Sequence, residues 1–299
     1  MHTTRRKFLR TLAVGLTAAG TRPAPAAEAA PPPRVGSQLY GWGQYYQREG
    51  KNLNNHLDEV FSALRDAGYD FAEGFLDVAN PEANLRFAER LRARGLRPVT
   101  LYTGARLHDE QAGEVVQRLL TAARACREAG FRVINCNPDP IGREKTEAEL
   151  QRQVAALIEL GRGLQALGLK LGLHHHTPEL SHQAREFHYN FQHSPPELVG
   201  FNIDTHWMYR GGLPPLEALR TYGVRVVSWH LRQSRDGVWW EDLDTGDVDY
   251  SAIARYAHEH CLAPVYAVEL ALEAGTRITR SAVENHRRSR DFVRRVFGV

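Results

Sequence analysis

The segment Gly168-Leu169-Lys170-Leu171-Gly172-Leu173-His174-His175-His176 decides the fold, because a glycine precedes a short apolar run that ends in polar side chains. A glycine that follows an amphipathic stretch is typical of the left-handed end of a helix, and a short apolar run is typical of a buried strand. Gly68, Gly95 and Gly130 stand at equivalent points earlier in the chain. The recurrence predicts repeated helix–turn–strand units.

Eight apolar runs of this kind alternate with longer amphipathic segments, which is the pattern of βαβ units on a parallel sheet. Helix start signals lie between them, such as the capping residue and first-turn proline of Asn80-Pro81. Another is the capping box that Thr146 forms with Glu149. The predicted strands are Val35–Tyr40, Phe71–Phe75, Pro98–Tyr102, Val133–Cys136, Lys170–His174, Val199–Asp204, Arg225–Leu231 and Val265–Glu269.

The number of units decides between two parallel-sheet architectures. Eight strands, each followed by a helix, suit a closed (β/α)8 barrel, the TIM barrel, over residues 31–299. An open doubly wound sheet is the alternative, but no predicted strand is followed by the Gly-x-Gly-x-x-Gly turn that would favour it. We therefore expect one barrel domain with its chemistry at the C-terminal ends of the strands.

Residues 1–30 differ from the rest and are expected to be an export signal and tether. Arg5-Arg6-Lys7 precedes a short apolar stretch, Leu12–Ala19, and Ala24-Pro25-Ala26 offers a cleavage site. This order matches a twin-arginine signal and predicts a periplasmic or otherwise exported protein. The apolar stretch is shorter than the roughly 20 residues that span a bilayer, so no stable membrane insertion is expected after the signal is removed.

The formal net charge of the 299-residue chain, +3, depends on this N-terminal segment. Removal of residues 1–26 takes away five basic residues and no acidic one, which changes the charge from +3 to −2. Nucleic-acid-binding domains concentrate positive charge on their binding surface. The charge balance of the remaining chain therefore excludes a nucleic acid as the expected partner.

The fifth to eighth predicted strands end in side chains that commonly bind metal ions. A mixed set of imidazole and carboxylate ligands suits Mn²⁺, Zn²⁺, Co²⁺ or Fe²⁺, and the absence of thiolates there argues against a structural zinc site. A divalent metal would polarise a carbonyl or hydroxyl group so that a carboxylate could move a proton. The four strand ends carry His174-His175-His176, Asp204-Thr205-His206, His230 and Glu269.

The same part of the chain resembles the strand-five to strand-eight signatures of the sugar phosphate isomerase/epimerase superfamily, the xylose isomerase-like TIM barrels. The resemblance covers most of the domain and is strongest from Lys170 to Leu270. It is carried by Gly172–Glu179, Asp204–Trp207, His230–Gln233, Gly246–Tyr250 and Val268-Glu269.

The resemblance implies a divalent metal held by Asp204, His230 and Glu269, with Glu269 also acting as the proton-transferring base. Many epimerases of the family have a fourth ligand, a glutamate, at the end of strand five, where this chain has His174. We expect His174 as the replacement ligand or acid/base, and His176, on the same face of the strand, is an equal choice. The His-His-His-x-x-Glu pattern ending at Glu179 is similar to that of dehydratase-like members.

Other side chains at the predicted barrel mouth are expected to contact a carbohydrate. Arg232 offers a planar donor to a sugar oxygen or carboxylate, with a salt bridge as its alternative role. Aromatic rings on such loops stack on sugars, or else pack the loops or a subunit interface. Residues 181–194 are expected to form a lid or insertion after strand five. The expected contacts are Arg232, His206, Trp207, Trp42, Glu73 and Glu179.

The expected function is that of a metal-dependent isomerase or epimerase that acts on a sugar, keto-sugar or cyclitol by metal-assisted proton transfer. The sequence has no Gly-rich or clustered-basic phosphate cradle, which favours an unphosphorylated substrate. A related lyase or dehydratase acting on a keto-glycoside and a non-catalytic sugar-binding barrel are the alternatives. A homo-oligomer is compatible with the sequence. An endonuclease of the same superfamily is disfavoured by the negative charge of the mature chain.

Overall fold

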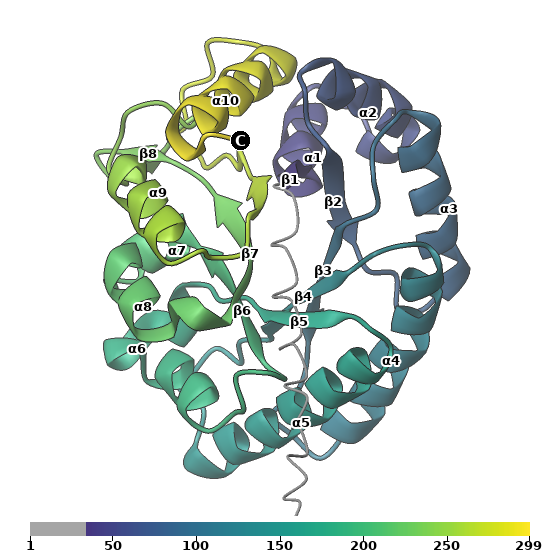
Figure 1. Cartoon of the computed structure of the whole chain (residues 1–299), viewed down its shortest axis with the longest axis vertical. Helices are drawn as coiled ribbons and strands as arrows, with labels where there is room; N and C mark the ends of the chain where they lie inside the picture. Colours follow the sequence, from purple (N-terminus) through teal and green to yellow (C-terminus); the bar gives the residue numbers. More distant parts are fainter. Residues whose placement is uncertain (1–33) are drawn as a thin grey trace, which may run out of the picture. The chain divides into compact units, whose positions relative to one another are not determined.

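The computed structural model describes residues 34–299, and the expected export signal lies outside this range. Eight parallel strands close into a barrel in the order β1-β10-β7-β6-β5-β4-β3-β2, and helices surround them (Figure 1). The expected TIM barrel is therefore confirmed. The barrel strands are β1 (Arg34–Gln38), β2 (Phe71–Phe75), β3 (Thr100–Ala105), β4 (Val133–Pro138), β5 (Lys170–Leu173), β6 (Gly200–Asp204), β7 (Val226–Leu231) and β10 (Val265–Val268).

The helices begin and end where the sequence provides caps. Thr146 accepts a hydrogen bond from the backbone N–H of Glu149, whose carboxylate accepts one from the N–H of Thr146. Gly68, Gly95 and Gly130 adopt positive φ angles at helix ends, as a left-handed cap requires. The helices are α1 (Leu39–Arg48), α2 (Leu57–Asp66), α3 (Pro81–Ala93), α4 (Ala112–Glu128), α5 (Glu147–Ala166), α6 (Thr177–Gln192), α7 (Thr205–Arg210), α8 (Pro215–Tyr222), α9 (Tyr250–Glu259) and α10 (Ala282–Phe297).

Two local differences from the expected elements affect the mouth of the barrel. Strand β1 ends at Gln38, because the Gln38 side chain accepts a hydrogen bond from the N–H of Tyr40 and so caps helix α1. A short antiparallel hairpin, β8 (Ser234–Arg235) with β9 (Val238–Trp239), follows β7. Both features place aromatic residues near the ends of the barrel strands.

The expected lid over residues 181–194 is corrected by the structure, because most of this segment belongs to helix α6. Ser181, at the surface, begins a short break in the helix, where three residues have positive φ angles. Leu180, Phe187 and Phe191 are buried on either side of the break. The apolar side chains therefore fix the segment against the barrel.

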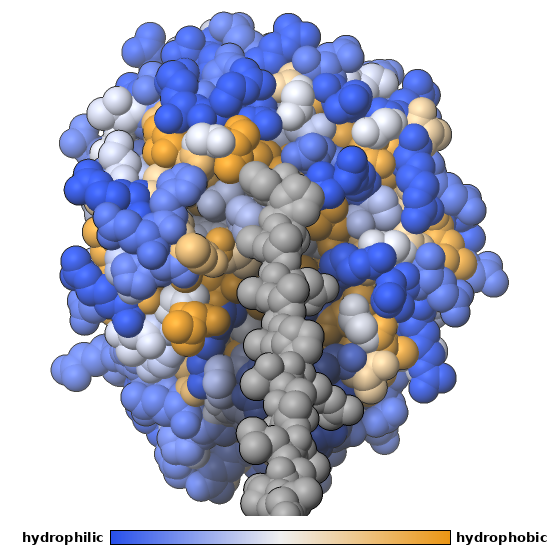
Figure 2. All heavy atoms as spheres, in the orientation of Figure 1, coloured by the Kyte–Doolittle hydropathy of each residue, from blue (hydrophilic) through white to orange (hydrophobic). Residues whose placement is uncertain are grey.

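Toward their C-terminal ends, the strands present polar side chains to the barrel interior and apolar side chains to the helices, whereas Phe71, Val99 and Ala267 form an apolar cluster of their own. Phe201 of β6 contacts Phe187 and Phe191 of α6, whereas its neighbour Asn202 hydrogen-bonds to Ser228 of β7. Alternate residues of a strand point to opposite faces. Figure 2 shows hydrophilic residues over most of the visible helical surface and hydrophobic residues between them. Within residues 34–299, no helix has the length and apolar character needed to cross a bilayer.

Candidate metal centre and cavity

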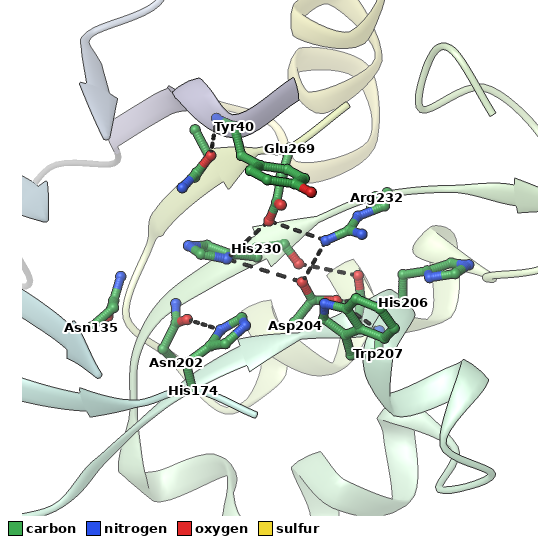
Figure 3. A network of polar contacts seen from close by, with 12 residues as sticks. Tyr40, Asn135, His174, Asn202, Asp204, His206, Trp207, His230, Arg232 and Glu269 are labelled. Carbon is green, nitrogen blue, oxygen red and sulfur yellow. Dashed lines mark hydrogen bonds and ion pairs between the residues drawn. The ribbon is translucent and has the colours of Figure 1, made fainter. Parts of the chain in front are cut away.

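Inward-facing side chains from β5, β6, β7 and the end of β10 meet inside the barrel (Figure 3). The register pairs Asn202 with Ser228 and Asp204 with His230. Residues two apart on a strand face the same way, so these pairs form two successive layers. The outer layer, with Asp204 and His230, lies nearer the C-terminal ends of the strands.

His174, Asp204 and His230 form a candidate metal centre. Each residue is buried and offers one ligand atom, and these atoms lie within 4.8 Å of one another. The Nδ1 atom of His230 is buried without a hydrogen-bond partner, and its Nε2 lies 2.6 Å from Oε1 of Glu73. A carboxylate that accepts the Nε2–H leaves the Nδ1 lone pair free for a metal. The donor set of two imidazoles and a carboxylate suits a divalent transition metal.

Glu269 lies next to this group without belonging to it, which differs from the expected ligand set. Its Oε2 is 3.2 Å from Nδ1 of His230 and 3.1 Å from Nη2 of Arg232. The same arginine nitrogen is 3.2 Å from Oδ2 of Asp204. Arg232 therefore bridges the two carboxylates. Three of the four expected ligands, His174, Asp204 and His230, belong to the ligand group, and Glu269 lies beside it.

The charges of this cluster also fit a divalent cation. Three carboxylates, those of Glu73, Asp204 and Glu269, accompany one guanidinium, that of Arg232. When the imidazoles are neutral, two negative charges lack compensation, and a buried unpaired charge is costly. Although burial alone would lower it, Glu73 and Glu269 raise the pKa of His230 to about 10. A divalent cation would compensate both of these charges, whereas protonation of His230 compensates only one.

Two groups beside the centre are unprotonated at neutral pH and so can accept a proton. Although burial alone would raise it, Arg232 and His230 hold the pKa of Glu269 at about 2, so this side chain is a carboxylate at neutral pH. Burial lowers the pKa of His176 to about 4, so its ring is neutral. The rings of His176 and His174 lie 4.8 Å apart.

A cavity of about 460 Å³ adjoins the candidate metal centre. The guanidinium of Arg232 lies 5.2 Å from the ring centre of Trp207 and 4.3 Å from that of Trp239. Aromatic walls with a few fixed polar groups are typical of small-molecule sites. Arg232 and Trp207 therefore lie where a substrate contact was expected. The cavity is lined by Gln38, Tyr40, Phe75, Tyr102, His174, His176, Pro178, Trp207, His230, Arg232, Trp239 and Glu269.

Trp42 and His206, which were expected to contact a substrate, lie outside this lining. Trp42 is buried, its ring centre 4.2 Å from that of His286, and it donates a hydrogen bond to Ser37. His206 is buried, 6.0 Å from the ring of Trp239. Both expectations are corrected, because these side chains pack in the protein interior.

Glu73 and Glu179 are likewise corrected from substrate contacts to internal roles. Glu73 has no exposed surface, and its carboxylate contacts Nε2 of His230. Glu179 is buried and accepts a hydrogen bond from the N–H of His176 at 2.6 Å, which caps helix α6. Burial raises the pKa of Glu179 to about 7.

Three polar residues inside the barrel were missed by the sequence predictions: Asn135, Asn202 and Ser228. They are buried and hydrogen-bonded to one another. The two-residue period of the strands could have found two of them, because Asn202 precedes Asp204 by two positions and Ser228 precedes His230 by two.

Comparison with known proteins now identifies the family. Residues 61–295 match the sequence profile of the xylose isomerase-like TIM barrels. The chain belongs to this family. This xylose isomerase-like barrel is 25% identical over 199 residues to inosose dehydratase 2 of one Bacillus cereus strain and 24% identical over 199 residues to inosose dehydratase of another. Each alignment covers 62% of this chain, and the chain spans 65% of the length of these relatives.

Solved structures support the fold. A sugar phosphate isomerase/epimerase from Parabacteroides distasonis ATCC 8503 has a TM-score of 0.71 at 18% identity, with 89% of this chain and 95% of that chain covered. L-ribulose 3-epimerase gives 0.69 at 19% identity with the same coverage. The IOLI protein, solved with a binding zinc atom, gives 0.67 at 16% identity, with 89% and 98% covered.

Proposed function

We propose that this barrel is a metal-dependent isomerase or epimerase that moves a proton next to the carbonyl of an unphosphorylated sugar, keto-sugar or cyclitol. One observation carries the proposal. The carboxylate of Glu269 lines the cavity and lies beside the buried group of His174, Asp204 and His230. A base next to a metal-binding group is what abstraction of a carbon-bound proton requires.

The residues would divide the work as follows. His174, Asp204 and His230 would hold a divalent metal, which supplies Lewis-acid polarisation of the substrate oxygen. Glu269 takes the proton from the adjacent carbon, because it is ionised and faces the cavity. Arg232 orients a substrate oxygen with its fixed guanidinium. The aromatic rings of the lining exclude water from the reacting atoms.

A dehydration is the second candidate, and the residue at the end of β5 favours it. His174 stands where many epimerases have a second glutamate, so Glu269 is the only carboxylate among the residues that line the cavity. A single carboxylate suits removal of a proton followed by loss of a neighbouring hydroxyl as water. The similarity to inosose dehydratases supports this alternative.

Proton exchange in D2O tests both candidates. The purified protein, loaded in turn with Mn²⁺, Zn²⁺, Co²⁺ or Fe²⁺, is incubated with free ketoses, inososes and keto-glycosides, and NMR detects deuterium at the carbon beside the carbonyl. Epimers or aldoses identify the first candidate, and loss of water identifies the second. Glu269→Gln should abolish exchange, whereas Glu179→Gln, a buried glutamate outside the cavity, should retain it. Binding of these compounds without exchange would refute catalysis and favour a sugar-binding barrel.

We also propose that residues 1–30 direct export by the twin-arginine route. The support is the order of basic, apolar and small residues in this segment. Cell fractionation should find the protein in the periplasm, and replacement of Arg5 and Arg6 by lysine should retain it in the cytoplasm. Unchanged export of that variant would contradict the twin-arginine assignment.

A further inference from the structure

A continuous chain of hydrogen bonds crosses the barrel beneath the candidate metal centre and joins its two histidines. The chain runs from His230 through Glu73, Asn135, Ser228 and Asn202 to His174. Its successive contacts measure 2.6, 2.8, 2.8, 2.8 and 2.7 Å. All six side chains are buried. Figure 3 shows its last contact, between Asn202 and the ring of His174.

The direction of every hydrogen bond in this chain follows from Glu73. Asn135 donates a hydrogen bond from Nδ2 to Oε2 of Glu73, so its Oδ1 turns toward Ser228. Ser228 then donates its hydroxyl proton to Asn135 and accepts from Nδ2 of Asn202. The Oδ1 of Asn202 therefore faces Nδ1 of His174, which must carry the proton.

The barrel leaves space for this chain at Gly172 of β5. A Cβ atom at Gly172 would lie 2.3 Å from Oδ1 of Asn135 and 3.1 Å from Cβ of Asn202. The register places Gly172 beside Asn135. Since the backbone of Gly172 has no positive φ angle, the requirement for glycine here is one of space.

We propose that Glu73, through Asn135, Ser228 and Asn202, fixes His174 in its Nδ1–H tautomer and so leaves Nε2 as a metal-binding atom. The same carboxylate accepts the Nε2–H of His230, so Nδ1 is the nitrogen on which a metal can replace the proton. One buried glutamate thus prepares both histidines, and Asn135, Ser228 and Asn202 are positioning residues. The part of this inference that concerns metal affinity rests on the proposed function, whereas the tautomer does not.

The tautomer is measured directly by NMR of the full chain labelled with ¹⁵N-histidine and freed of metal with EDTA. Signals that disappear in His174→Gln belong to His174. We expect a protonated Nδ1 and a bare Nε2. Ser228→Ala should populate the Nε2–H form, because Asn202 then loses the acceptor that orients it. Ser228→Ala should also lower the affinity for Zn²⁺, measured by calorimetry without substrate, about 10–100-fold.

Two further variants distinguish an effect of this hydrogen-bond chain from a general effect of altered packing. Ser228→Thr keeps the hydroxyl and should restore the wild-type tautomer and Zn²⁺ affinity. Ser37→Ala removes a buried barrel hydroxyl outside the chain and should leave both unchanged. A wild-type His174 protonated on Nε2, or an unchanged tautomer in Ser228→Ala, overturns the proposal. If Ser228→Ala does not fold, the tautomer of His174 in the wild-type spectrum decides for or against the proposal. Absence of turnover with these results intact would refute the proposed function alone.

Discussion

Replacement of Arg232 by alanine should destabilise the fold strongly. Its side chain is 1% exposed and lies 3.2 Å from Asp204 and 3.1 Å from Glu269. Removal of one partner from a buried ion pair costs about 3–5 kcal/mol, because the remaining charge is uncompensated. Loss of the contact with the Trp239 ring adds roughly 0.5–2 kcal/mol. We therefore expect the free energy of unfolding to fall by about 3.5–7 kcal/mol.

Urea unfolding of the metal-free protein, followed by circular dichroism, measures this loss. Arg235→Ala is the matched control, because the half-buried Arg235 follows β7 three residues after Arg232 and lies over the ring of Trp240 at 4.0 Å, but makes no ion pair within residues 34–299. That variant should lose less than about 1 kcal/mol. Adding Glu269→Gln to Arg232→Ala should recover part of the stability, since one unpaired charge is then removed. An equal loss in the two arginine variants would refute the reasoning.

Three other predictions concern the ligand His230, the buried Glu179 and the space at Gly172. His230→Ala should weaken Zn²⁺ binding at least about 100-fold in calorimetry, because it removes a ligand and the hydrogen bond by which Glu73 orients that ligand. An unchanged Zn²⁺ affinity would contradict the candidate centre. Burial raises the pKa of Glu179 from 4.5 to about 7. As the pH rises, the unfolded state therefore loses this proton at a lower pH than the folded state does. The free energy of unfolding should fall by roughly 2–3 kcal/mol as the pH rises from 4.5 to about 7. Glu179→Gln should flatten that dependence in urea unfolding at several pH values, and an equally steep profile would count against it. Gly172→Ala should lower the unfolding free energy by about 1–3 kcal/mol through its contact with Asn135, and an unchanged thermal unfolding midpoint would show that the space is not needed.

Local patterns in the sequence were enough to predict most of the fold. The strand Phe71–Phe75 was predicted with the bounds it has, and strand β7 differs from its prediction by one residue at its start. Such runs depend on residues adjacent in the chain, so periodicity detects them. The prediction for the first strand ran too far, because the side chain of Gln38 turns the chain into helix α1. The hairpin of β8 and β9 has too few residues for a periodic signal.

The sequence by itself also determined which strand ends would meet, because closure of an eight-stranded barrel brings the C-terminal ends of neighbouring strands together. It could not determine which polar side chain takes which role there. Glu73 and His230 are 157 positions apart, and only their contact shows that Glu73 supports a ligand. Trp42 carries the same aromatic ring as Trp207, yet it is buried against His286 while Trp207 lines the cavity. Strand position follows from local spacing, whereas the role of a side chain depends on the neighbours that tertiary packing supplies.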